Sequence, residues 1–178
     1  MFATRRRDAN PLAMAAREWK FGVLVKMMAG NFVRYWVPVL TWMLVIFAAS
    51  TDLMSAEHTS RFLGPFLRWL IPDIPLATIA TVQFVVRKTA HVVEYAVLGA
   101  LLLRATALGG EKAGWTRVAL ALLLAASWAA IDEFHQSFLA SRTGTPKDVM
   151  IDTAGALLGL ACYARIARWK QRRSFVEA

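Results

Sequence analysis

The chain has 178 residues, 57% of them hydrophobic, and its 21 lysines and arginines against 12 aspartates and glutamates give a formal net charge of +9. With a mean hydropathy of +0.44, this composition argues against an ordinary soluble domain and predicts a small, basic integral membrane protein. Cys162 is the single cysteine, so an intramolecular disulfide is excluded, and we expect it to be a small buried packing residue.

Residues 1–33 are predicted to form a basic segment in the cytoplasm or at the inner membrane surface. Residues 1–10 lack the apolar core and the small-residue cleavage site of a signal peptide, so we expect them to be retained. Residues 12–33 mix Arg17, Lys20 and Lys26 with apolar side chains, which favours an amphipathic helix on the inner surface. Ordinary juxtamembrane charge explains the same pattern equally well.

Four stretches are suited to cross a bilayer as helices, which requires about 20 mostly apolar residues each. They are Tyr35 to Thr51, about Phe84 to Leu108, Trp115 to about Phe138, and Pro146 to about Ile166. The expected fold is therefore all-α, an integral membrane four-helix bundle over residues 34–167 with a basic cytoplasmic tail over 168–178. The stretch from Asp52 to Val86 mixes aromatic and basic residues and is predicted to form an interfacial cap at the outer face.

The charges of the flanking segments predict the orientation of the bundle. Both termini are rich in arginine and lysine, and the positive-inside tendency therefore places both in the cytoplasm, as an even number of spans requires. Trp36, Trp115 and Trp169 then fall together at the inner interface, where tryptophan is enriched. Each span is polar at one end only, so the polar ends of the second, third and fourth spans meet at the outer face.

Ionisable residues at these polar ends make up the candidate site. Charges near the bilayer centre cost at least ~2.5 kcal/mol each, so such residues are functional candidates by default. Two triplets have the spacing i, i+3 and i+4, which places each on one helix face: His91, Glu94 and Tyr95, and then Asp132, His135 and Gln136.

The start of the last span adds two more acidic residues. Asp148, Asp152, Gly155 and Gly159 follow at i, i+4, i+7 and i+11, so both aspartates are expected to face the bundle. The two glycines form a Gly-x-x-x-Gly pair, which favours close helix packing in membranes. Glu133 lies about a quarter-turn from Asp132 and is free to point elsewhere.

Several of these residues belong to longer motifs. The motifs are Arg87-Lys88-Thr89-Ala90-His91-Val92-Val93-Glu94-Tyr95, Asp132-Glu133-Phe134-His135-Gln136-Ser137-Phe138, Arg142, Asp148, Asp152-Thr153-Ala154-Gly155 with Gly159, and Phe47-Ala48-Ala49-Ser50-Thr51. From about Tyr35 to Ile166 the chain resembles the VanZ-like family of bacterial membrane proteins, whose namesake is associated with teicoplanin resistance. One departure is that the family usually has Pro-Gly before the loop arginine, where this chain has Leu139-Ala140-Ser141. The resemblance implies a location in the bacterial inner membrane and a role in tolerance to glycopeptides.

Some of the same residues also have structural explanations. His91, Glu94, Asp132 and His135 could form a polar network that holds the helices together. The run Thr145-Pro146-Lys147-Asp148 has the pattern of a helix start, with an N-cap, a proline at the first helical position and an acidic residue three after the cap.

The basic residues allow two explanations as well. Arg87 and Lys88 could extend to the outer interface or hold an anionic headgroup. Arg142, in a short outer loop, is the better candidate for gripping a phosphate or carboxylate bidentately.

Two classes of function stay open. An enzyme, a hydrolase or transferase acting on a phosphate-bearing lipid, would use acids, bases or nucleophiles drawn from His91, Glu94, Asp132, His135 and Asp152. Its substrate-binding residues would be Arg87, Lys88, Tyr95, Glu133, Gln136, Arg142 and Asp148. A binding or assembly protein would use the same groups to recognise an envelope lipid or a glycopeptide without turnover.

The expected partner is a membrane lipid or a lipid-linked envelope precursor, and no nucleic-acid partner is expected. Histidine and carboxylate side chains suit several divalent metals, so a divalent cation is possible as a cofactor. The spacing of these residues does not identify which metal it would be. A transporter is less favoured because no inverted repeat is evident. The oligomeric state is not specified by the sequence.

Overall fold

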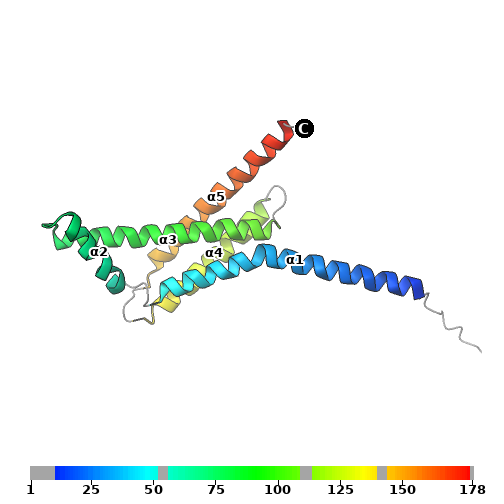
Figure 1. Ribbon diagram of the computed structural model, residues 1–178, viewed down its shortest axis with the longest axis horizontal. Coiled ribbons are helices and arrows are strands. Elements are labelled where there is room, and N and C mark those ends of the chain that lie inside the picture. The colour runs from blue at the N-terminus through cyan, green and yellow to red at the C-terminus, as the bar shows by residue number, and fades with distance from the viewer. Residues whose placement is uncertain (1–10, 52–55, 109–113, 140–143, 177–178) are drawn as a thin grey trace, which may run out of the picture.

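The computed structural model describes residues 11–51, 56–108, 114–139 and 144–176, and the described chain is almost entirely helical (Figure 1). The helices are α1 (Pro11–Ser50), α2 (Ala56–Leu70), α3 (Leu76–Thr106), α4 (Trp115–Gln136) and α5 (Pro146–Val176). The expected all-α class is confirmed.

Three helices are long and apolar enough to cross a membrane. The segments concerned are Trp19–Ser50, Trp115–Gln136 and Pro146–Ser174. With 31 residues, α3 has the length but also contains Arg87, Lys88, Glu94 and Arg104. The chain is therefore a membrane protein with three apolar helices. The second predicted span corresponds to α3, which packs against all three of them.

The bounds of the helices differ from expectation in three places. The N-terminal amphipathic helix and the first span form one continuous helix, α1, with Pro38 inside it, and Figure 1 shows this helix bending near its middle. A proline removes one backbone donor and bends a helix without having to end it. Helix α3 begins at Leu76 rather than near Phe84, and α5 continues through the basic tail to Val176.

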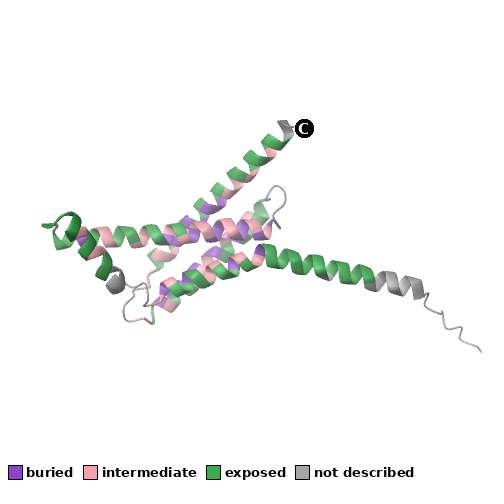
Figure 2. Ribbon diagram, viewed as in Figure 1, coloured by how far each residue is buried: buried purple, intermediate pink, exposed green. Residues whose placement is uncertain are grey.

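Helix α2 occupies the stretch predicted to be an interfacial cap. It is amphipathic and contacts α3. Figure 2 shows that the coloured parts of α2, of the N-terminal half of α1 and of the C-terminal end of α5 are mostly exposed and lie away from the buried centre. Large apolar side chains such as Trp19 and Phe66 are exposed on them, as expected for helices that meet lipid.

Cys162 is also exposed, so its prediction as a buried packing residue is wrong.

Helix α3 is the centre of the arrangement, because it contacts each of the other four helices. Its packing on α5 is the most extensive, and contacts between Val92 and Gly155 and between Ala96 and Gly159 show that the two helices run in the same direction. Helix α1 runs opposite to α3, since Trp42 donates to the Glu94 carbonyl whereas Tyr35, about two turns earlier, contacts Arg104.

Small residues allow the helices to approach closely. A Cβ atom at Gly155 would lie 2.6 Å from the Val92 carbonyl oxygen, and one at Gly159 would clash with the Ala96 carbonyl. The prediction that this glycine pair permits close packing is thus confirmed. Gly99 of α3 plays the same part against Ala156, which the sequence did not reveal.

Helix α4 contributes a stripe of small residues that leads to the candidate site. Ala121, Ala125 and Ala129 are fully buried at intervals of four, so they lie on one face of the helix. The same face continues one turn later with buried Asp132 and Gln136. The transition from alanine to polar residues therefore occurs inside the packed interior.

Candidate functional site

The buried polar residues gather at one end of the packed helices. They are Ser50 of α1, His91 of α3, Asp132, Glu133 and Gln136 of α4, and Asp152 of α5. Because α1 and α4 end here while α5 begins here, residues far apart in sequence meet. The expected convergence of polar ends from the second, third and fourth spans agrees with this geometry, and α1 joins it.

The Asp132 group consists of Ser50, Asp132 and Gln136. The Ser50 hydroxyl donates to Asp132 Oδ2 over 2.6 Å, and Gln136 Nε2 donates to the same oxygen over 3.0 Å. Gln136 Nε2 also lies 3.3 Å from Ser50 Oγ. These bonds hold the Asp132 carboxylate between α1 and α4.

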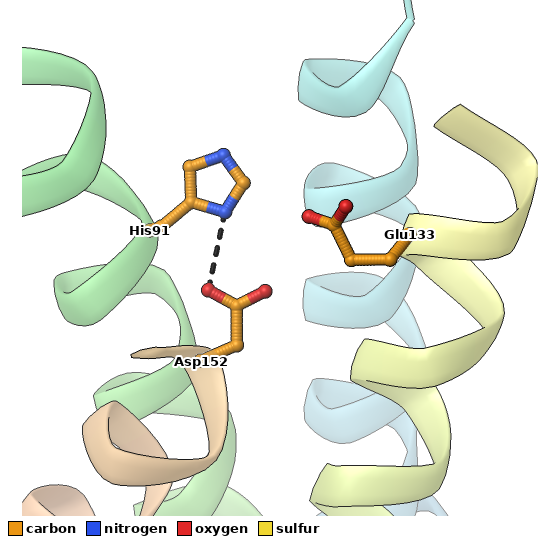
Figure 3. A group of neighbouring side chains, drawn as sticks. All are labelled: His91, Glu133 and Asp152. Carbon is orange, nitrogen blue, oxygen red and sulfur yellow. Dashed lines mark hydrogen bonds and ion pairs between the residues drawn. The ribbon is translucent and has the colours of Figure 1, made fainter. Parts of the chain in front are cut away.

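The His91 group consists of His91, Glu133 and Asp152, from three different helices. His91 Nδ1 lies 3.1 Å from Asp152 Oδ1, and Figure 3 shows the Glu133 side chain pointing toward this pair from the opposite side. One ligand atom from each residue lies within 4.8 Å of the others. Asp132 directly precedes Glu133 in α4, so the two groups adjoin.

The start of α5 is fastened to both α3 and α4. Asp148 N donates to Thr145 Oγ1 over 3.3 Å, which is the predicted N-cap contact. The Thr145 backbone N–H donates to Glu133 Oε2 over 2.9 Å. Asp148 forms an ion pair with Lys88 of α3. Its carboxylate therefore binds α3 instead of the backbone N–H of the N-cap residue, as it would in a capping box.

Several buried polar atoms in and near the site have no hydrogen-bond partner among the described residues. They are Tyr95 Oη, Trp128 Nε1, Asp132 Oδ1, Glu133 Oε1, His135 Nδ1 and Asp152 Oδ2. Each unpaired buried group costs about 1–3 kcal/mol, and more if it is charged. Three of these atoms are carboxylate oxygens, so the site is rich in acceptors for a proton, a cation or a hydrogen-bond donor.

The remaining predicted residues are placed less centrally. The His135 ring packs against Phe47, with 4.7 Å between ring centroids, and is not in the His91 group. Glu94 is half-buried, and its backbone carbonyl accepts a hydrogen bond of 2.9 Å from the Trp42 indole.

Tyr95 and the basic residues differ in how deeply they are buried. The Tyr95 side chain is fully buried, whereas Arg87 is half-buried and lies over the Phe84 ring at 6.0 Å. Lys88 lies over the same ring at 5.6 Å. Arg142 lies outside the described residues, so the expectation for it has no structural counterpart.

Sequence reasoning missed or undervalued several contributors. Ser50 was noted only as part of a motif, and Thr145 only as a cap, although both bond directly to site carboxylates. Glu133, which helical geometry left free to point elsewhere, is 4% exposed and faces the interior. Gly144 is needed because a Cβ there would clash with the Glu133 carbonyl oxygen. A glycine just before a Thr-Pro helix start was the available signal.

Comparison with known families bears on the origin of this arrangement. The VanZ/LLP1 family model matches residues 32–168, which include the site-bearing parts of α1, α3, α4 and α5. Neither the curated proteins nor the solved structures gave a match. Since the family model covers most of the chain, including both polar groups, the protein belongs to the VanZ/LLP1 family.

Proposed function

We propose that this membrane protein acts on a phosphate-bearing cell-envelope lipid or lipid-linked precursor, through the Asp132 and His91 groups at the outer face of the bacterial inner membrane. The observation that carries the proposal is a set of buried carboxylate oxygens, one each on Asp132, Glu133 and Asp152, to which no described residue donates a hydrogen bond. Buried ionisable residues in a membrane protein are candidates for function by default.

The distribution of charge supports an outward-facing site. Arg34 and Arg104 both lie over the Tyr35 ring, at 5.5 and 5.1 Å from its centroid, far along α1 from Ser50. The acidic groups are at the other end of the same helices. The positive-inside tendency then places the arginines in the cytoplasm and the acidic site outside.

Acid–base chemistry is the activity that these residues suit. The His91–Asp152 contact can orient the imidazole as a general base or acid, as a carboxylate does in many catalytic pairs. Asp132, held by Ser50 and Gln136, keeps one oxygen for a substrate proton. Arg87, near Phe84, supplies positive charge for a phosphate group, whereas Lys88 is paired with Asp148.

Binding or assembly without turnover is the second candidate. It is favoured by the two hydrogen bonds that fix Asp132 Oδ2, because a fixed carboxylate suits recognition as well as catalysis. In that case the protein holds an envelope lipid or a glycopeptide. A contribution to teicoplanin tolerance is compatible with either candidate.

Lipid mass spectrometry on cells with and without the protein tests the proposal. The enzyme form predicts an altered lipid together with loss of its precursor, and Asp132→Asn should abolish both changes at normal membrane abundance. Asp73→Asn, the same chemical change at an exposed residue in the turn before α3, is the matched control. Co-purification of a lipid without any change in the cellular lipids indicates the binding form.

The proposal fails under a clear condition. If Asp132→Asn folds normally and the cells keep both the lipid profile and the teicoplanin tolerance of the wild type, Asp132 has no part in catalysis or ligand binding.

A further inference from the structure

The geometry points to a divalent transition-metal site formed by His91, Glu133 and Asp152. One ligand atom from each lies within 4.8 Å of the others, and Figure 3 shows the three side chains turned toward a common centre. Ligands on opposite sides of an ion at about 2.1 Å are about 4.2 Å apart. Small side-chain adjustments are therefore enough to bring all three onto one ion.

Unpaired oxygens are the second observation behind this inference. Asp152 is fully buried and Glu133 is 4% exposed, yet Asp152 Oδ2 and Glu133 Oε1 have no hydrogen-bond partner among the described residues. In Figure 3 the second oxygen of Asp152 points toward the Glu133 carboxylate. Two carboxylates that face each other in a buried setting repel unless a proton or a cation lies between them.

The charge balance of the group fits a doubly charged cation. Glu133 and Asp152 together supply two negative charges, and a neutral His91 adds none. The nearest basic side chain on α3, Lys88, is already paired with Asp148. A divalent ion thus balances the negative charges of Glu133 and Asp152, which Lys88 does not neutralise.

The ligand types favour Mn²⁺, Fe²⁺ or Zn²⁺ over Ca²⁺ or Mg²⁺, because the latter two prefer sites made of oxygen alone. The backbone N–H of Thr145 already fixes one Glu133 oxygen, at 2.9 Å, and such second contacts orient metal ligands. Metal binding requires deprotonated ligands, so ion uptake should release protons.

Three protein ligands leave at least one coordination position for water or a phosphate oxygen, as in catalytic rather than structural metal sites. In this respect the inference deepens the proposed lipid function and rests on it. Binding of the metal itself involves only His91, Glu133 and Asp152, so it can be measured without any lipid substrate.

Titration of the full-length protein in detergent with Mn²⁺, followed by electron paramagnetic resonance, tests the site, with Zn²⁺ as competitor. We expect one ion per chain and a nitrogen coupling from histidine in the pulsed spectrum. His91→Gln should remove the coupling and weaken Mn²⁺ binding by at least about tenfold. Glu133→Gln and Asp152→Asn should weaken it similarly, whereas Asp73→Asn should match the wild type.

Several results would overturn the inference. One is a folded wild-type protein that binds neither Mn²⁺ nor Zn²⁺ saturably, and another is a His91→Gln variant with unchanged affinity and spectrum. If the variants do not fold, wild-type protein containing ¹⁵N-histidine decides the matter, because an unchanged nitrogen coupling excludes histidine as a ligand. Metal binding with neither a lipid change in cells nor a lipid that co-purifies with the protein would refute the proposed function alone.

Discussion

At the scale of single residues, the site combines carboxylate oxygens that accept hydrogen bonds with others that accept none from the described residues. Asp132 Oδ2 accepts from both Ser50 and Gln136, while Asp132 Oδ1 has no partner among the described residues. One oxygen thus holds the side chain in place and the other is left for chemistry. Asp152 repeats the division: Oδ1 contacts His91, and Oδ2 has no partner in the part of the chain that the structure describes.

Ser50→Ala tests whether the hydrogen bond from Ser50 holds the Asp132 carboxylate in place. The change removes one donor to a buried carboxylate, and a hydrogen bond to a charged group contributes about 1.5–3 kcal/mol. We expect the free energy of unfolding in detergent to fall by about that amount. Ser137→Ala removes an exposed hydroxyl that bonds the Phe134 carbonyl and should change stability by less than about 0.5 kcal/mol. Equal effects of the two variants would show that Ser50 does not anchor Asp132.

At the scale of elements, the contact between α3 and α5 holds the His91 group together. His91 and Asp152 lie on these two helices, and the glycines that let the backbones approach are one or two turns further along. Gly155 and Gly159 lie against Val92 and Ala96, the residues next to and one turn beyond His91. Any side chain that separates the helices also separates His91 from Asp152.

Gly159→Ala tests the contact between these helices. A methyl group at this position would clash with the Ala96 backbone carbonyl, so we expect a clear loss of thermal stability and, if the metal site exists, weaker Mn²⁺ binding. Gly30→Ala places the same methyl group in open space on α1 and should stabilise slightly, by up to about 1 kcal/mol, because alanine favours a helix. A Gly159→Ala variant as stable as Gly30→Ala would contradict the close approach.

At the scale of the whole molecule, the helices alternate in direction, and the two ends of the packed helices differ in charge. Helices α3 and α5 run together, and α1 runs against α3. The acidic groups therefore collect at one end and the arginines around Tyr35 at the other. This polarity is the physical basis for assigning an orientation in the membrane.

Cysteine labelling at the two ends of α4 tests that orientation. In a Cys162→Ala background, Ser137→Cys should react with a membrane-impermeant maleimide in intact cells whose outer membrane, where present, has been opened. Gly114→Cys should react only after the inner membrane is permeabilised. Both positions are exposed, so the difference reports sidedness rather than burial. The reverse pattern would place the acidic site in the cytoplasm.

Local patterns in the sequence were enough to predict the helices and the faces that carry the polar residues. Apolar length predicted α4 almost to the residue, and the Thr-Pro pair predicted the start of α5 at Pro146. The spacing of Asp132 and Gln136 and of Gly155 and Gly159 predicted shared faces, because these depend only on the helical repeat. Such features are determined within one helix and need no knowledge of its neighbours.

Which residues meet depends on how the helices pack against one another. The rotation and axial offset of one helix against another depend on the whole packed interface, so neither the Ser50–Asp132 bond nor the close fit of Gly99 on Ala156 follows from helical periodicity. The same holds for Glu133, whose direction changes with a small rotation of α4, and which packing turns toward His91 and Asp152. Helical periodicity and apolar length are therefore enough to predict a membrane protein with acidic helix ends, whereas the packing of four helices brings those ends together into a site.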